Sequence, residues 1–142
     1  MIDSELITFL KGDAAVLAIV GDNVAVGDRP ADDNGEPLVE SYIWLSLFDE
    51  VDILDLTGTG GLTRFGFDIE CCSVDLATAK TLGQLVKKRL QGYQGFFGTY
   101  YIPGVFVESK DDQYIPVNRF AEADLSVVAL DVEIVTDDTI ND

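Results

Sequence analysis

The carboxylates are the side chains of this chain with the widest scope for chemistry. Its 142 residues include 26 acidic residues, nine basic residues and no histidine. The missing imidazole removes the commonest general base, the usual partner of a serine or cysteine nucleophile, and the commonest metal ligand. A catalytic carboxylate pair needs a dry, shaped pocket that shifts one pKa. Because the neighbouring pairs stand in polar stretches, we expect solvated charge and no enzyme; these pairs are Asp32/Asp33, Asp111/Asp112 and Asp137/Asp138.

Three short strings have the composition of ligand loops, but each lacks an essential residue. In DDNGE (32–36), placing Gly35 at the sixth position of a calcium loop makes Pro30 the first ligand. GTGGLT (58–63) lacks the third glycine of the dinucleotide fingerprint. GLTRFGF (61–67) has Phe67 where a phosphate loop has lysine. We therefore expect no metal and no cofactor.

The cysteines and the N-terminus indicate the compartment. Cys71 and Cys72 are adjacent, and neighbouring residues of a strand point to opposite faces, so we expect two reduced thiols of a cytosolic protein. MIDSELITFL has no basic region and no cleavage site, so a signal peptide is not expected. No apolar run approaches the length of a membrane span.

The net charge of −17 bears on possible partners. Such a field repels phosphate, which argues against binding of free nucleic acid. It also keeps a monomer soluble until it meets an assembly partner. Plain solubility, or an acidic proteome, explains the same charge.

Helix signals stand at the start and in the middle of the chain. Asp3 or Ser4 caps a first helix that ends at Gly12, and Asp13 caps a second over Ala14–Val20. The main helix is capped by Asp75 and ends at Gly92, with Lys80, Gln84, Lys87, Lys88 and Gln91 on its polar side. Its apolar stripe consists of Leu76, Ala79, Leu82, Val86 and Leu90.

The remaining apolar segments predict strands. They cover residues 24–26, 41–48, 63–73, 105–109 and 125–135. Residues 41–48 are apolar on both alternating faces, which predicts a strand covered on both sides. Residues 27–37, 50–61 and 110–119 read as loops, and the segment 50–61 makes a long-looped hairpin of its two flanking strands. The expected fold is an α+β two-layer sandwich, an antiparallel sheet of about four strands with helices on one face. Residues 1–135 would form one domain, with a frayed polar tail at 136–142.

An aromatic group lies in the segment GYQGFFGTYY (92–101), which follows the main helix and is expected to be a turn. Such a group can be the edge of a core, a contact between subunits or a platform for a ligand, and the sequence leaves all three open. The residues are Tyr93, Phe96, Phe97, Tyr100 and Tyr101.

The chain resembles the phage tail-completion, or tail terminator, family, which includes tail-to-head joining proteins and the terminators of lambda-like phages. The resemblance covers about residues 5–135. It rests on the order of the elements and on five segments: VGDNVAVGDRP, SYIWLSL, TRFGFDIECCS, DLATAKTLGQLVKKRLQG and VFVESKDDQYIPVNRFAEADLSVVALDVEIV. The chain departs from the family in its stronger acidity and in its acidic 28–40 segment.

The resemblance implies a non-enzymatic structural subunit of the phage neck. Such subunits form a ring, usually a hexamer, that ends the tail tube and offers the surface to which the head attaches. The implied partners are further copies of the chain, the tail tube protein and a head–tail connector or stopper protein, with the genome passing through the bore unbound. The implied location is the virion, after assembly in the host cytoplasm. A head-side connector or stopper, or a small ligand-binding module using residues 93–101, remains an alternative.

Two sets of residues are our candidates for contacts. The segment 50–61 is expected to order on the tube or on a neighbouring subunit, through Glu50, Asp52, Asp55, Thr57, Gly58, Thr59 and Gly60. Acids facing the bore would repel the passing genome, and the candidates are Glu108, Asp111 and Asp112.

Overall fold

The computed structural model describes residues 2–27, 41–53, 61–115 and 125–137, with the backbone alone at positions 53, 109–115 and 125. Three helices accompany the strands: α1 (Ile2–Lys11), α2 (Ala14–Val20) and α3 (Leu76–Leu90). The strands are β1 (Val24–Val26), β2 (Tyr42–Ile53), β3 (Leu62–Ser73), β4 (Gly95–Phe97), β5 (Tyr100–Ile102), β6 (Gly104–Ile115) and β7 (Leu125–Asp137).

The main sheet has the strand order β1-β2-β3-β7-β6. Its four long strands are antiparallel, whereas β1 runs parallel to β2. The expected α+β class is confirmed, but the sheet has five strands and is mixed. The expectation of a purely antiparallel sheet fails at β1, because three residues carry too little alternation to reveal the direction of pairing.

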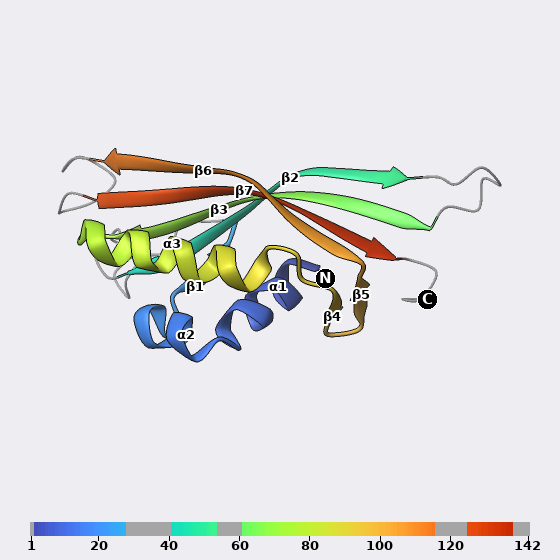
Figure 1. Cartoon of the computed structure of the whole chain (residues 1–142), viewed down its shortest axis with the longest axis horizontal. Coiled ribbons are helices and arrows are strands. Elements are labelled where there is room, and N and C mark those ends of the chain that lie inside the picture. Colours follow the sequence, from blue (N-terminus) through green and yellow to red (C-terminus); the bar gives the residue numbers. More distant parts are fainter. Residues whose placement is uncertain (1, 28–40, 54–60, 116–124, 138–142) are drawn as a thin grey trace.

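All three helices lie on one side of the sheet, so the fold has two layers (Figure 1). Alternate residues of β3 and β7 face the helices and are fully or almost fully buried, among them Phe67, Ile69, Val132 and Ile134. The stripe of α3 packs on these strands at Gly83, where an added Cβ would stand 2.6 Å from Cγ1 of Val128. The helical layer is thus set directly on the centre of the sheet.

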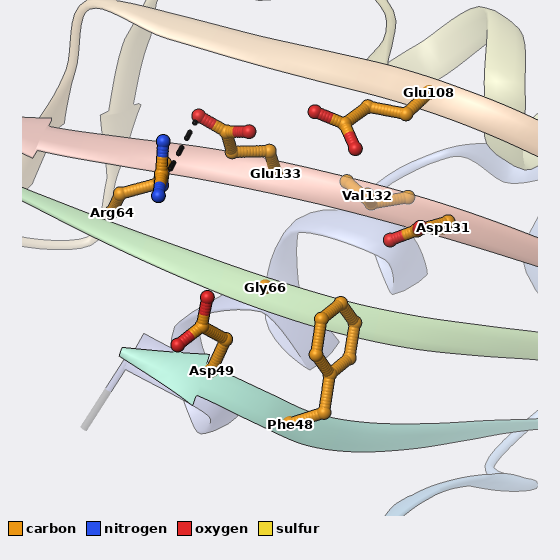
Figure 2. A pocket seen from close by; sticks show the side chains of 8 residues that line it. All are labelled: Phe48, Asp49, Arg64, Gly66, Glu108, Asp131, Val132 and Glu133. Carbon is orange, nitrogen blue, oxygen red and sulfur yellow. Dashed lines mark ion pairs between the residues drawn. The ribbon is translucent and has the colours of Figure 1, made fainter. Parts of the chain in front are cut away.

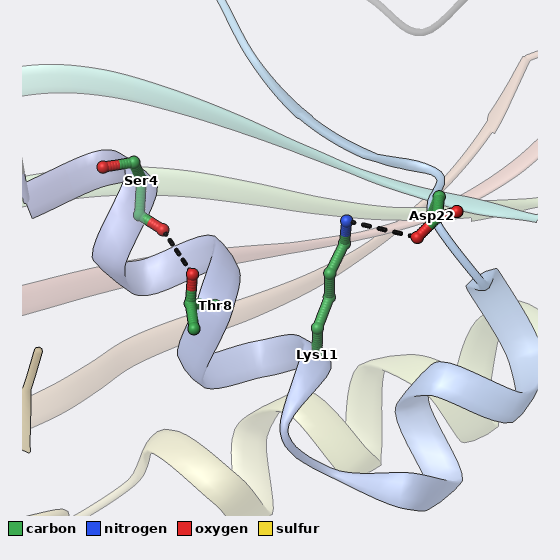
Figure 3. A network of polar contacts seen from close by, with 4 residues as sticks. All are labelled: Ser4, Thr8, Lys11 and Asp22. Carbon is green, nitrogen blue, oxygen red and sulfur yellow. Dashed lines mark hydrogen bonds and ion pairs between the residues drawn. The ribbon is translucent and has the colours of Figure 1, made fainter.

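Local contacts fix the two N-terminal helices. The Asp13 carboxylate accepts hydrogen bonds from the backbone N–H groups of Ala15 (2.9 Å) and Val16 (3.2 Å), as an N-cap does. In α1 the Thr8 hydroxyl donates to the Ser4 carbonyl at 3.1 Å (Figure 3). Lys11 Nζ lies 3.6 Å from Asp22 Oδ1, which ties the end of α1 to the turn after α2 (Figure 3).

Three local predictions were wrong. Residues 50–53 belong to β2 and residues 110–115 to β6, although both were expected in loops. Each strand contains a bulge, between Leu47 and Asp49 in β2 and between Val107 and Ser109 in β6. A bulge shifts the alternation by one residue, so the pattern breaks in mid-strand and imitates a strand end. The segment after α3, expected as a turn, contains the β4–β5 hairpin.

The expectation that residues 41–48 are covered on both faces holds only for the first half. Tyr42, Ile43 and Leu45 are buried, but Leu47 is 45% and Phe48 60% exposed. The ends of β2 and β3 nearest their connection extend past the helices (Figure 1). Cys71 and Cys72 are both buried, and neither forms a disulfide bond within the described residues.

Candidate interaction face

Side chains that point away from the helices form what we call the open face of the sheet. The register places Asp49 beside Gly66, Gly66 beside Glu133 and Glu133 beside Phe106. In the next row Asp68 lies beside Asp131. The open face therefore collects acidic side chains from strands that are far apart in the sequence.

The two bulges lie on either side of the β3–β7 pair and border a shallow cavity of about 270 Å³ on the open face. Figure 2 shows the bulged residues Phe48 and Glu108 projecting at its two sides. Its lining consists of Phe48, Asp49, Arg64, Gly66, Glu108, Asp131, Val132 and Glu133. Four of these eight side chains are carboxylates and one is a cation, so the cavity is suited to a positively charged group.

Phe48 is held over the cavity by the absence of a side chain at Gly66. A Cβ built on Gly66 would lie 2.8 Å from Cε2 of Phe48. The ring thus packs on bare backbone while remaining 60% exposed. On the far edge Phe106 is 52% exposed and lies against Gly104. Two exposed aromatic rings therefore flank the acidic cavity.

The carboxylates of the open face are only partly neutralised. Arg64 Nε lies 3.6 Å from Glu133 Oε1 (Figure 2). A hydrogen bond with Glu133 raises the pKa of Glu108, desolvation and the charge of Glu133 raise it further, and Arg64 opposes these effects. Desolvation, followed by repulsion from Asp131, raises the pKa of Asp68. Repulsion from a neighbouring carboxylate thus contributes to both shifts, after the hydrogen bond at Glu108 and after desolvation at Asp68.

The predicted interface residues fall in different places. Glu50 and Asp52 are exposed on β2, where the Asp52 carboxylate accepts a hydrogen bond from the Thr63 hydroxyl at 3.1 Å. The rest of the predicted tube contact lies outside the described residues: Asp55, Thr57, Gly58, Thr59 and Gly60.

Of the predicted bore-facing acids, Glu108 lies at the cavity beside Glu133. Asp111 and Asp112 belong to β6, and their backbones pair with Ala129 and Val128. The expected loop at this place is thus replaced by an edge strand. Arg64, Asp131 and Glu133 also line the cavity and were not predicted as site residues, although their alternating positions in β3 and β7 are a signal that their side chains face outward.

The aromatic group after α3 is divided between two environments. Phe97 is buried, and its ring stacks on Tyr93 with a centroid distance of 5.3 Å and lies 4.5 Å from the ring of Phe9. Phe96 is 54% exposed and meets Tyr101 edge-on at 5.2 Å. The core-edge interpretation holds for the first set, while Phe96 remains available for contacts.

Within the described residues, no cluster of three or more His, Cys, Asp or Glu side chains has an arrangement that could hold a metal ion. No helix in the described part of the chain is long and apolar enough to cross a membrane.

Residues 4–137 match the family described as Tail completion protein gp17. The chain belongs to this family. The resemblance inferred from the sequence is thereby confirmed, and the tail-completion protein has a structural role in the phage tail as a component of the virion. Assembly with other virion proteins follows from that membership.

The fold is shared with a solved structure. The tail-completion protein is similar to a chain of the "Virion of native gene transfer agent (GTA) particle", with a TM-score of 0.66 and 23% sequence identity. The likeness covers 95% of this chain and 93% of the other, so the two have the same fold over nearly their whole lengths. No curated protein matches the chain.

Proposed function

We propose that the tail-completion protein forms a ring at the head-proximal end of the tail tube. The ring stops growth of the tube and presents the surface to which the filled head attaches. The observation that carries this proposal is the family match over residues 4–137, since it spans nearly the whole chain. The function is one of shape and charge, in which no covalent bond is made or broken.

The projecting part of the β2–β3 hairpin supports a contact with the tube. Leu47, Phe48 and Val51 are exposed on β2, by 45%, 60% and 37%. Exposed apolar side chains gathered on one element mark a protein–protein interface. Because the ends of β2 and β3 nearest their connection extend past the helices (Figure 1), a partner reaches that end of the hairpin without displacing a helix.

The net charge supports a place on the path of the genome. A strongly negative protein does not retain DNA by its phosphates, which suits a ring that the genome must cross. Asp111 and Asp112 remain our candidates for acids close to that path.

The proposal is tested by joining tails to heads in vitro. Tails assembled without the protein are mixed with filled heads and with wild-type protein, or with a variant in which residues 54–60 are replaced by a short turn. We expect the wild-type protein to restore joined particles and the variant to fold without restoring them.

Single substitutions sharpen this test. Leu47→Ser should reduce joining, whereas Leu17→Ser on α2 should not, although the two leucines are almost equally exposed at 45% and 43%. Normal joining by the variant shortened at 54–60 and by Leu47→Ser would refute the assignment of this hairpin to the tube.

A further inference from the structure

The charge of α3 differs from that of the rest of the chain. The chain has 26 acidic residues, yet the sequence of α3, LATAKTLGQLVKKRL, contains none. Four of the nine basic residues lie in this helix: Lys80, Lys87, Lys88 and Arg89. In a protein of net charge −17, α3 is a concentrated positive element.

Helix stability does not account for this composition. Cations in the last turn complement the helix dipole, which explains Lys87, Lys88 and Arg89. The same effect favours acids in the first turn, where α3 has none. It gives no reason for Lys80, which lies nearer the N-terminal end.

Among the described residues, Arg89 alone of these four cations has a partner within the subunit. Arg89 Nε donates to the Phe9 carbonyl at 2.6 Å, and its guanidinium lies 4.1 Å from the centre of the Phe9 ring. Lys80, Lys87 and Lys88 are exposed, and none forms an ion pair with another described residue. The outer surface of α3, formed by Lys80, Gln84, Lys87 and Lys88, is thus free to meet an acidic partner.

The open face has the complementary charge. Asp49, Asp68, Glu108, Asp131 and Glu133 lie around one cation, Arg64, among the described side chains of the cavity and the row beside it. Phe48 and Phe106 flank this region and supply the apolar surface that a protein interface needs around its charges. The helices lie on the other side of the sheet (Figure 1), so the two surfaces are on opposite layers of one subunit.

We propose that the outer surface of α3 in one copy docks on the open face of the next copy. The occupant of the face is therefore a second copy of this chain, whose lysines pair with the carboxylates between Phe48 and Phe106. Because the two surfaces differ and lie on opposite layers, every copy uses both at once, which is the heterologous contact that generates a ring. This inference rests on the proposed ring and assigns its subunit contact. It moves Glu108 from the bore into that contact.

Charge reversal tests the contact. Native mass spectrometry and sedimentation at low and high salt compare the wild-type protein with Lys87→Glu/Lys88→Glu, with Asp49→Lys/Glu108→Lys, and with the four substitutions combined. All five positions, the control Asp22 included, are exposed. Asp22→Lys, on the helical layer, is the control for a reversed charge elsewhere.

We expect the wild-type protein to form oligomers that salt weakens, since exposed charge pairs are screened. Each double variant should weaken self-association at least tenfold. The combined variant should recover most of the wild-type self-association, and Asp22→Lys should associate like the wild-type protein. The inference is overturned if the wild-type protein stays monomeric, or if either double variant assembles normally. A combined variant that recovers nothing would also overturn it.

A separate experiment measures the length of tails made without the protein and their attachment to heads. Normal tails would refute the neck function itself, whereas abnormal tails with unaltered charge variants would refute only this contact.

Discussion

The ring of Phe48 lies on the backbone of Gly66, so close that a Cβ there would be 2.8 Å from Cε2. This contact joins the bulge of β2 to the centre of the open face. The ring packs on this backbone at the edge of the acidic cavity while it remains 60% exposed. This contact also means that the side chain at position 66 determines where the aromatic surface stands.

Gly66→Ala should therefore displace Phe48 while leaving the fold intact. In the wild-type background the gain in strand propensity and the clash oppose one another, so we expect a change in unfolding free energy within about 1 kcal/mol. In a Phe48→Ala background the clash with the ring is gone and only Asp49 Cβ stays close, at 3.2 Å, so Gly66→Ala should be more favourable there than in the wild-type background by about 0.5–1 kcal/mol. Chemical denaturation of the four proteins of this cycle measures the coupling. Equal effects of Gly66→Ala in both backgrounds would show that the ring does not rest on Gly66.

Gly83→Ala should destabilise the protein, against the ordinary preference of a helix. Within a helix this change stabilises by about 1 kcal/mol when nothing opposes it. Here the new Cβ would stand 2.6 Å from Cγ1 of Val128 in the core, and overpacking costs about 1–3 kcal/mol. Adding Val128→Ala should relieve this penalty, and thermal unfolding checks both. A stabilising Gly83→Ala would mean that α3 does not sit on β7 at this point.

Arg89→Met should loosen α1 from α3. The substitution removes the hydrogen bond to the Phe9 carbonyl and the cation over the Phe9 ring, together worth about 1–2 kcal/mol. Arg89→Lys keeps the charge and should recover part of that loss, because an ammonium group can occupy the same place without the planar stacking. Unfolding by denaturant compares the three proteins. Full stability of Arg89→Met would contradict the link between the two helices.

Glu108→Gln should change how stability depends on pH. The pKa of Glu108 is raised above 4.5, chiefly by its hydrogen bond with Glu133. The stability that this protonated carboxyl adds to the fold is therefore complete below pH 4.5 and is lost as the pH rises through the folded-state pKa. Glutamine keeps a donor for Glu133 at every pH.

The stability of Glu108→Gln relative to the wild-type protein should therefore increase as the pH rises from below 4.5 to neutral. Asp75 acts in the opposite sense in both proteins, because the hydrogen bond from Thr78 lowers its pKa. Melting temperatures of the pair across this range isolate Glu108, and a constant difference between them would refute the sharing of a proton with Glu133.

The parts of the fold that the sequence reveals are those with an unbroken period. Alternating apolar residues predicted β3, and an apolar stripe predicted α3. Both predictions lie within a residue or two of the observed bounds. The long strands β2 and β6 were cut short in the prediction because Phe48 and Glu108 interrupt their alternation. The β4–β5 hairpin was missed, although Gly98, with φ of 59°, stands in the two-residue turn between its aromatic strands.

The candidate face was less accessible to sequence reasoning. The alternation of β3 and β7 predicts which of their side chains face outward. That these side chains lie beside Glu108 depends on β7 pairing between β3 and β6. This order places β7, the last strand of the chain, inside the sheet. No local sequence pattern predicts that strand order. The acid-free composition of α3 could have been read directly from the sequence, whereas its complement on the sheet required the register.

The most direct measurement of the proposed neck function is electron microscopy of particles made without this protein. The account predicts tails of irregular or excessive length that lie apart from filled heads, and a return to uniform, attached tails when the protein is supplied. Tails of normal length joined to heads in its absence would contradict it.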